Sequence, residues 1–299
     1  MPVTLKDKYV QFFADLQKVS HAAAKIDENC IYQEANLEAR KYMNLLLEEN
    51  ALEGSGLGNI EHFKAFYDAV IKEGKTGVVM MEHYSNLDLP FFLYLLEKSN
   101  TEWGKDFANR VVAVAGMKLN EASAGVRAFT EGFTRVVIYP TRSLDSLKAK
   151  GWTDEQIEEE EKRARKINFA AMRAMDGCKK RGQVILVFPS GTRYRPGQPE
   201  TKRGLREIDS YLRLFDIMLP VSINGSCLRI NPESPEDMLS DLVEKDVVTM
   251  TASPIVECKK FRNEILEKVP ADDPDPKQKT VDAVMQILEK THDEVEKTR

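Results

Sequence analysis

The sequence lacks a hydrophobic run long enough to cross a membrane as a helix. Its longest stretch without a charged residue covers 217–228 and is broken by Pro220, Asn224 and Gly225. A spanning helix needs about 20 mostly apolar residues. Residues 1–8 also lack the apolar core of a signal peptide and the Arg- and Ser-rich character of a transit segment. We therefore expect no helical membrane span.

An excess of positive charge is also missing. The formal net charge is -5, whereas a nucleic-acid-binding protein presents a broadly basic surface. We therefore expect no nucleic-acid partner. A small anionic substrate stays open, because a local basic patch can lie on an acidic protein.

Motifs that mark several other chemistries are missing too. The four histidines have no metal-ligand spacing, and the four cysteines form no CxxC motif, so we expect reduced thiols and no metal. Ser190 has Phe188 and Thr192 where a nucleophile elbow needs glycines. The glycine cluster at 54–58 is followed by Asn59, where a dinucleotide fingerprint needs a third glycine. No bound cofactor is expected.

The chain is nonetheless of a size and composition that bury a core. It has 299 residues, of which 42% are hydrophobic and 30% charged. Residues 5–50 carry mostly helical periodicity, and the breaker-rich segment 52–58 follows. We predict a small helical N-terminal domain over 1–52 and a larger α/β domain over 53–299.

Short apolar runs alternate with helical patterns in the larger domain. Runs rich in Val, Ile and Leu are typical of strands covered on both faces, which favours an α/β fold with a mixed, mostly parallel sheet flanked by helices. The predicted strands cover 77–81, 111–115, 135–139, 184–188, 218–223 and 247–251. The predicted helices cover 60–72, 89–97, 154–180 and 205–215. Ligands gather at the carboxyl ends of strands in open sheets.

His83 and Asp88 follow directly after the predicted strand 77–81. In a turn between a strand and a helix, the carboxylate of Asp88 would accept the Nδ1 proton of His83 and leave Nε2 free to take a proton from an alcohol. Asp88 is also a plausible N-cap for a helix that begins at Leu89. Taken alone, the pair fits a structural cap as well as a catalytic base.

A second group follows the strand 184–188. The segment 188–197 reads Phe-Pro-Ser-Gly-Thr-Arg-Tyr-Arg-Pro-Gly. Arg193 and Arg195 occupy alternate positions on a loop bounded by Gly and Pro, which suits bidentate recognition of a phosphate or carboxylate. Gly191 leaves room for close approach of the backbone. A surface loop with arginines paired to nearby acids is the alternative.

Four blocks in this order resemble the glycerolipid acyltransferase superfamily. They are the H-x4-D unit, the strand 135–139 with Arg142 just beyond it, the Phe-Pro-x-Gly-Thr-Arg loop and the Pro-containing strand 219–223. The superfamily usually has glutamate where this chain has Ser190. The form found here, Pro-Ser-Gly-x-Arg-x-Arg-Pro, is similar to that of the soluble, plastid-type glycerol-3-phosphate acyltransferases.

The resemblance implies an activity and a role for each matching residue. His83 would be the general base and Asp88 its orienting partner. Arg193 and Arg195, with Ser190 and Gly191 in the same loop, would bind the glycerol phosphate. Arg142 is the candidate for a further phosphate contact, although the family's histidine there has no counterpart.

The resemblance also implies substrates and a location. The acyl group would come from acyl carrier protein or coenzyme A as a co-substrate and go to the sn-1 hydroxyl of glycerol 3-phosphate, giving lysophosphatidic acid. Part of the basic run 162–166 would line the cleft, although pairs such as Glu158 with Lys162 also fit a solvated helix face. The protein would be cytoplasmic, or a mature protein of the plastid stroma.

Two other functions stay open at this point. A 1-acylglycerol-3-phosphate acyltransferase would use the same pair on an acceptor that already carries an acyl chain, with peripheral membrane contact through an interfacial helix. A non-catalytic lipid- or carrier-binding protein on the same fold is the second. Replacing His83 with Ala separates an enzyme from a binder, because only an enzyme loses turnover.

Overall fold

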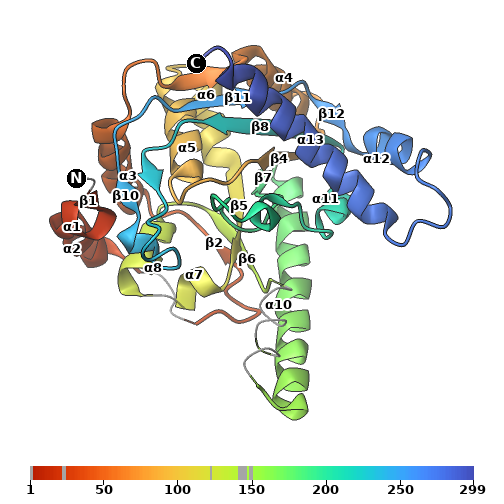
Figure 1. Ribbon diagram of the computed structural model, residues 1–299, viewed down its shortest axis with the longest axis horizontal. Helices are drawn as coiled ribbons and strands as arrows, with labels where there is room; N and C mark the ends of the chain where they lie inside the picture. Colours follow the sequence, from red (N-terminus) through yellow and green to blue (C-terminus); the bar gives the residue numbers. More distant parts are fainter. Residues whose placement is uncertain (1–2, 22–24, 122, 141–146, 148–150) are drawn as a thin grey trace. The chain divides into compact units, whose positions relative to one another are not determined.

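The computed structural model describes residues 3–21, 25–121, 123–140, 147 and 151–299 (Figure 1). The chain forms two compact units. The first contains residues 1–8, 44–111 and 182–299, and the second contains residues 9–43 and 112–181. The prediction that two separate domains meet at residue 52 stays a prediction.

The first unit is built on a mixed sheet in the order β7-β4-β8-β11-β3. Its central strand β4 is buried along its whole length and pairs in parallel with β7 on one side and β8 on the other. β8 continues to β11 in antiparallel pairing, and β12 also pairs with β8. The strands are β3 (Gly56–Gly58), β4 (Gly77–Met81), β7 (Val184–Val187), β8 (Ile217–Asn224), β11 (Thr249–Ala252) and β12 (Val256–Glu257).

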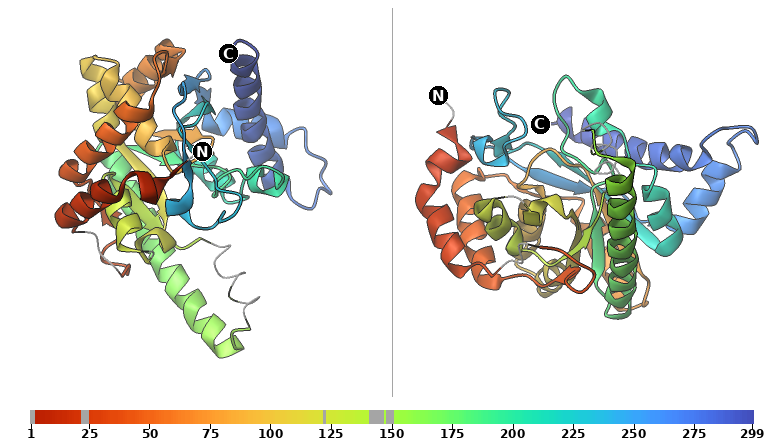
Figure 2. Two further views of the ribbon diagram at one scale, coloured as in Figure 1. Left: turned by 60° about the vertical axis from the view of Figure 1, so that its left-hand side comes forward. Right: turned by 90° about the horizontal axis from the view of Figure 1, so that it is seen from below.

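Helices flank this sheet. α4 packs on β8 and β11, and α13 runs along β8 and β11 (Figure 1). α11, α12 and α13 contact one another (Figure 2). The helices of this unit are α1 (Leu5–Lys8), α4 (Ile60–Ile71), α5 (Asp88–Lys98), α6 (Glu102–Arg110), α11 (Ile208–Leu214), α12 (Cys258–Leu266) and α13 (Pro276–Glu296), and α3 (Leu37–Asn50) enters it from the second unit.

Short elements complete the first unit. A small antiparallel sheet has the order β1-β10-β9. These strands and the two 3-10 helices are β1 (Val3–Thr4), β9 (Leu228–Arg229), β10 (Leu242–Val243), η1 (Pro199–Lys202) and η2 (Met238–Ser240).

An aromatic cluster joins the helices α4, α5 and α6. Phe92 of α5 lies 6.1 Å from Phe107 of α6 and 6.0 Å from Phe63 of α4, measured between ring centroids. All three rings are fully buried. Removing one such ring to Ala would cost about 3–5 kcal/mol. The cluster therefore fixes α5, whose first residue is Asp88.

The second unit contains strands in the order β2-β6-β5. β5 (Val111–Gly116) is parallel to β6 (Arg135–Ile138), and β2 (Tyr32–Gln33) is antiparallel to it. The long helix α10 (Asp154–Lys180) packs along β6, and α2 (Val10–Val19) packs on α8 (Ala124–Glu131). The short helix α7 (Lys118–Glu121) precedes α8.

The predicted α/β fold with a mixed, mostly parallel sheet flanked by helices is confirmed. The six predicted strands all form, with ends that differ by at most two residues. The breaker-rich segment 52–58, for which no strand was predicted, contains β3, which pairs in parallel with β11. A Cβ at Gly58 would collide with the side chain of Thr251, so a breaker in the sequence serves close strand packing.

Candidate active site

His83 and Asp88 meet at the carboxyl end of β4, as predicted. His83 Nδ1 lies 2.9 Å from Asp88 Oδ2. The Asp88 side chain is only 4% exposed, and that of His83 is 18% exposed. Because the carboxylate oxygen also accepts backbone N–H groups, the shared proton belongs on Nδ1 of the imidazole. In the neutral imidazole with this tautomer, Nε2 carries no proton and is able to accept one.

Asp88 is held by the turn before it. Its Oδ2 accepts the backbone N–H groups of Tyr84 at 2.6 Å and Ser85 at 2.8 Å, and its Oδ1 accepts the Ser85 hydroxyl at 2.9 Å. The prediction that Asp88 is the N-cap of α5 is wrong. Asp88 is the first helical residue, Leu87 is the N-cap, and the carboxylate points back into the turn. Its bonds therefore close the turn around His83.

Three backbone N–H groups of the turn after His83 donate hydrogen bonds within the protein. The N–H groups of Tyr84 and Ser85 already donate to Asp88. The N–H of Leu87 donates to the Ser85 hydroxyl at 3.1 Å. These three amides support the turn and are not directed at a substrate.

The loop after β7 lies against the histidine. The ring of Phe188 stacks on that of His83, with centroids 4.0 Å apart and planes 16° from parallel. The N–H of Tyr194 donates to the His83 carbonyl at 2.7 Å. Since β4 and β7 are parallel neighbours, their carboxyl ends lie at the same edge of the sheet. The His83 turn and the arginine loop are therefore joined directly.

Arg193 is buried and paired with an acid that the sequence did not point to. Its Nη1 forms an ion pair with Asp241 Oδ2, and the two side chains are 7% and 0% exposed. Asn86 Nδ2, from the His83 turn, donates to the same carboxylate oxygen at 3.2 Å. Burial raises the pKa of Asp241 to about 6, although the neighbouring Arg193 opposes the shift. Asp241 thus fixes Arg193 beside the turn.

Arg195 lies nearer the surface. Its Nη2 is 3.1 Å from Glu236 Oε1, and its Nη1 donates to the Thr192 hydroxyl at 3.3 Å. Its backbone N–H donates to the Thr201 hydroxyl at 2.9 Å. Its Nε is buried and has no hydrogen-bond partner in the part of the chain that the structure describes. The guanidinium is therefore positioned but not saturated.

Ser190 and Gly191 shape the loop from within. The Ser190 hydroxyl donates to the Thr192 carbonyl at 2.7 Å. Gly191 has a φ of 62°, and a Cβ there would collide with Leu205. The expectation that Gly191 leaves room for close backbone approach is wrong, because the Leu205 side chain fills that space. Glycine is required here by its backbone conformation.

Other basic side chains near these motifs are paired with acids or lie outside the described residues. Arg142 lies outside the described residues. Lys162 pairs with Glu158 at 2.8 Å on α10, as the helix-face reading expects. In the loop after Arg195, Lys202 pairs with Glu289 at 3.2 Å and Arg206 with Asp275 at 2.8 Å.

Glu82 and His292 form a second histidine–carboxylate pair beside the first. His292 Nδ1, on α13, lies 3.0 Å from Glu82 Oε2. The hydrogen bond to Glu82 raises the pKa of His292, against the effect of burial. The sequence indicated neither residue, because Glu82 falls between a strand and a motif and His292 lies on an ordinary amphipathic helix.

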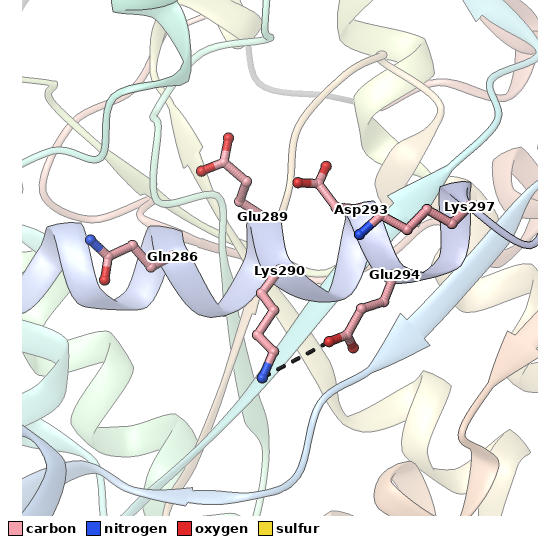
Figure 3. A pocket seen from close by; sticks show the side chains of 6 residues that line it. All are labelled: Gln286, Glu289, Lys290, Asp293, Glu294 and Lys297. Atoms are coloured by element: carbon pink, nitrogen blue, oxygen red, sulfur yellow. Dashed lines mark ion pairs between the residues drawn. The ribbon is translucent and has the colours of Figure 1, made fainter.

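A hollow on the surface of α13 differs from these groups in the residues that line it. Its walls come from one helix and are polar or charged, with Lys290 3.9 Å from Glu294 (Figure 3). Among the described residues, no group of three or more His, Cys, Asp or Glu side chains is arranged to hold a metal ion. No described helix is long and apolar enough to cross a membrane.

The fold and the site define an α/β protein with a partly exposed histidine at the strand ends, oriented by a buried carboxylate, and with arginines in the adjoining loop. A family model described as Acyltransferase matches residues 59–223, more than half of the chain. The chain therefore belongs to the Acyltransferase family, within the glycerolipid acyltransferase superfamily, and this membership indicates a lipid acyltransferase activity. The comparison with curated proteins found no match.

Proposed function

We propose that this acyltransferase moves a fatty acyl group from acyl carrier protein or coenzyme A to the sn-1 hydroxyl of glycerol 3-phosphate. The observation that carries the proposal is the 2.9 Å contact between His83 Nδ1 and the buried Asp88 carboxylate. This contact leaves Nε2 of His83 free to act as a general base at the edge of the sheet where the arginine loop also lies.

The reaction follows from that arrangement without a covalent acyl-enzyme. Nε2 of His83 takes the proton of the sn-1 hydroxyl while the hydroxyl oxygen attacks the thioester carbonyl carbon. The resulting imidazolium is stabilised by the Asp88 carboxylate. When the tetrahedral intermediate collapses, the C–S bond breaks and His83 returns the proton to the leaving thiolate. Such a base contributes typically about 10²- to 10⁴-fold in rate.

The arginines supply the affinity for the acceptor in this proposal. Arg193, Arg195 and Arg142 would bind the phosphate of glycerol 3-phosphate and hold its hydroxyl within attack distance, which can provide roughly 7–11 kcal/mol. The Tyr194 N–H to His83 carbonyl bond supports this, because it ties the arginine loop to the base. Ser190 and Gly191 would contribute by keeping the loop in shape. Arg195, whose side chain is 18% exposed against 7% for Arg193, is the more accessible of the two arginines for a phosphate oxygen.

Steady-state rates of the purified protein test the proposal. Each acceptor, glycerol 3-phosphate and lysophosphatidate, is combined with each donor, acyl carrier protein thioester and acyl-coenzyme A. We expect turnover with glycerol 3-phosphate, and product analysis should find the acyl group at sn-1. Turnover with lysophosphatidate alone would contradict the acceptor, and no turnover with either acceptor would contradict this enzymatic role.

A further inference from the structure

Glu82, the residue directly before His83, joins three parts of the first unit through one buried carboxylate. It is 5% exposed. Its Oε2 accepts the N–H of Ile223 on β8 at 2.9 Å and lies 3.0 Å from His292 Nδ1 on α13. Its Oε1 accepts the Tyr84 hydroxyl at 3.0 Å. A buried carboxylate with this many partners is fixed in place.

α13 is attached to the end of β8 at the same level. The His292 carbonyl accepts the Asn224 side-chain amide at 3.1 Å, and Glu296 accepts it at 2.8 Å. The His292 ring also lies 5.4 Å from the Tyr84 ring, and its Nδ1 is 3.3 Å from the Tyr84 hydroxyl. The C-terminal helix therefore reaches the turn that carries His83.

Tyr84 belongs to both histidine clusters. Its hydroxyl contacts Glu82 and His292, while its backbone N–H donates to Asp88 at 2.6 Å. The edge of its ring meets Tyr194, with centroids 5.9 Å apart, and the N–H of Tyr194 holds the His83 carbonyl. A shift of the Tyr84 side chain would therefore be transmitted to the donor that orients Asp88.

We propose that Glu82, Tyr84 and His292 are positioning residues that hold the His83–Asp88 turn in its reactive geometry. The inference rests on the proposed function for its kinetic readout. It makes α13 part of the framework of the site, although none of the three residues touches the reacting atoms. Tyr84 transmits the constraint through its backbone N–H.

The charge of His292 gives this role a pH dependence. The groups that face it are Glu82 after β4, Tyr84 in the turn, Lys202 on η1 and Glu296 on its own helix. Because the pKa of His292 is raised by Glu82, the imidazolium persists above the usual range and its charge is lost as pH rises through the raised value. The kcat of the wild-type protein should then decline on the alkaline side, and that decline should be absent from His292→Gln.

The kinetic test uses Tyr84→Phe, His292→Gln and the double variant, with Tyr67→Phe and His62→Gln as matched controls. Tyr67 also donates its hydroxyl to a carboxylate, that of Asp106 at 2.7 Å, and His62 Nδ1 also has one partner, the Ala252 carbonyl at 2.9 Å. Each test variant should lower kcat about three- to tenfold, the range of one hydrogen bond, with the KM of the acceptor unchanged. The double variant should lose no more than the worse single variant.

A second readout does not depend on which substrate is used. The proton NMR resonance of His83 Nδ1–H reports its hydrogen bond to Asp88 directly. We expect it to shift in Tyr84→Phe and His292→Gln and to stay unchanged in both controls. An unshifted resonance together with kcat within twofold of wild type would overturn the positioning role. If the wild-type protein uses neither acceptor, the proposed function fails, and the resonance alone decides this inference.

Discussion

His83 and His292 each present Nδ1 to a buried carboxylate in the same unit, at 2.9 Å from Asp88 and at 3.0 Å from Glu82. Their settings differ. Asp88 is otherwise bonded to groups of its own turn, whereas Glu82 is bonded to a strand, a helix and Tyr84. The first arrangement orients one ring, and the second connects elements. Both histidines are thus paired with a carboxylate. The other partners of each carboxylate distinguish the proposed general base, His83, from the proposed positioning residue, His292.

Substitution of His83 should lower kcat far more than substitution of His292. His83→Ala should lower kcat about 10²- to 10⁴-fold, because the general base is removed. Binding of glycerol 3-phosphate, measured by calorimetry, should stay within a fewfold, since the arginines remain. Equal losses of kcat in His83→Ala and His292→Gln would contradict the different roles of the two histidines.

The two carboxylates should differ in the same direction. Asp88→Asn should lower kcat on the order of 10²-fold, because an amide no longer holds the reactive tautomer of His83 or stabilises its imidazolium. Glu82→Gln keeps most of the shape of the side chain that contacts Tyr84 and His292, and it should lower kcat by about tenfold or less. Steady-state kinetics of both variants, with circular dichroism to compare their folding, provide the measurement. A Glu82→Gln effect as large as that of Asp88→Asn would count against the assignment.

Much of the first pair could be predicted from the sequence, and the second pair could not. The motif around His83 lies directly after an apolar run, and both the strand and the turn are local features. Glu82 and His292 are separated by 210 positions, and Asp241 reaches Arg193 across 48. No periodicity or spacing marks such contacts, because they arise only when β8 pairs with β4 and α13 packs on β8. The strand β3 was missed for a related reason, since its glycines read locally as a linker.

The arginine loop distinguishes the first pair further, because the N–H of Tyr194, between Arg193 and Arg195, donates to the His83 carbonyl. Arg195→Gln should raise the KM for glycerol 3-phosphate about tenfold or more with little change in kcat, since a charged hydrogen bond to phosphate is lost. Arg206→Gln serves as the control, because Arg206 is exposed and paired with Asp275. Similar KM values for the two variants would show that the loop does not bind the phosphate.

A further effect concerns the free energy of unfolding and another buried carboxylate, that of Asp241. Its pKa is raised from 3.8 to about 6 by burial, so the folded state keeps a proton between these values that the unfolded state has released. Stability contributed by this group therefore falls as pH rises from about 4 to 6, by about 2–3 kcal/mol at most. Urea unfolding should show Asp241→Asn gaining relative to wild type across that window. A pH-independent difference would rule out the titration.

We propose that His83, oriented by Asp88, is the general base for acyl transfer to glycerol 3-phosphate. The most direct measurement is the steady-state rate of acylation of glycerol 3-phosphate by the wild-type protein and by His83→Ala, under identical donor concentration. We expect turnover by the wild type and a loss of at least about 10²-fold in the variant, with acceptor binding retained. Equal rates for the two proteins, or no acylation of glycerol 3-phosphate by the wild type, would contradict it.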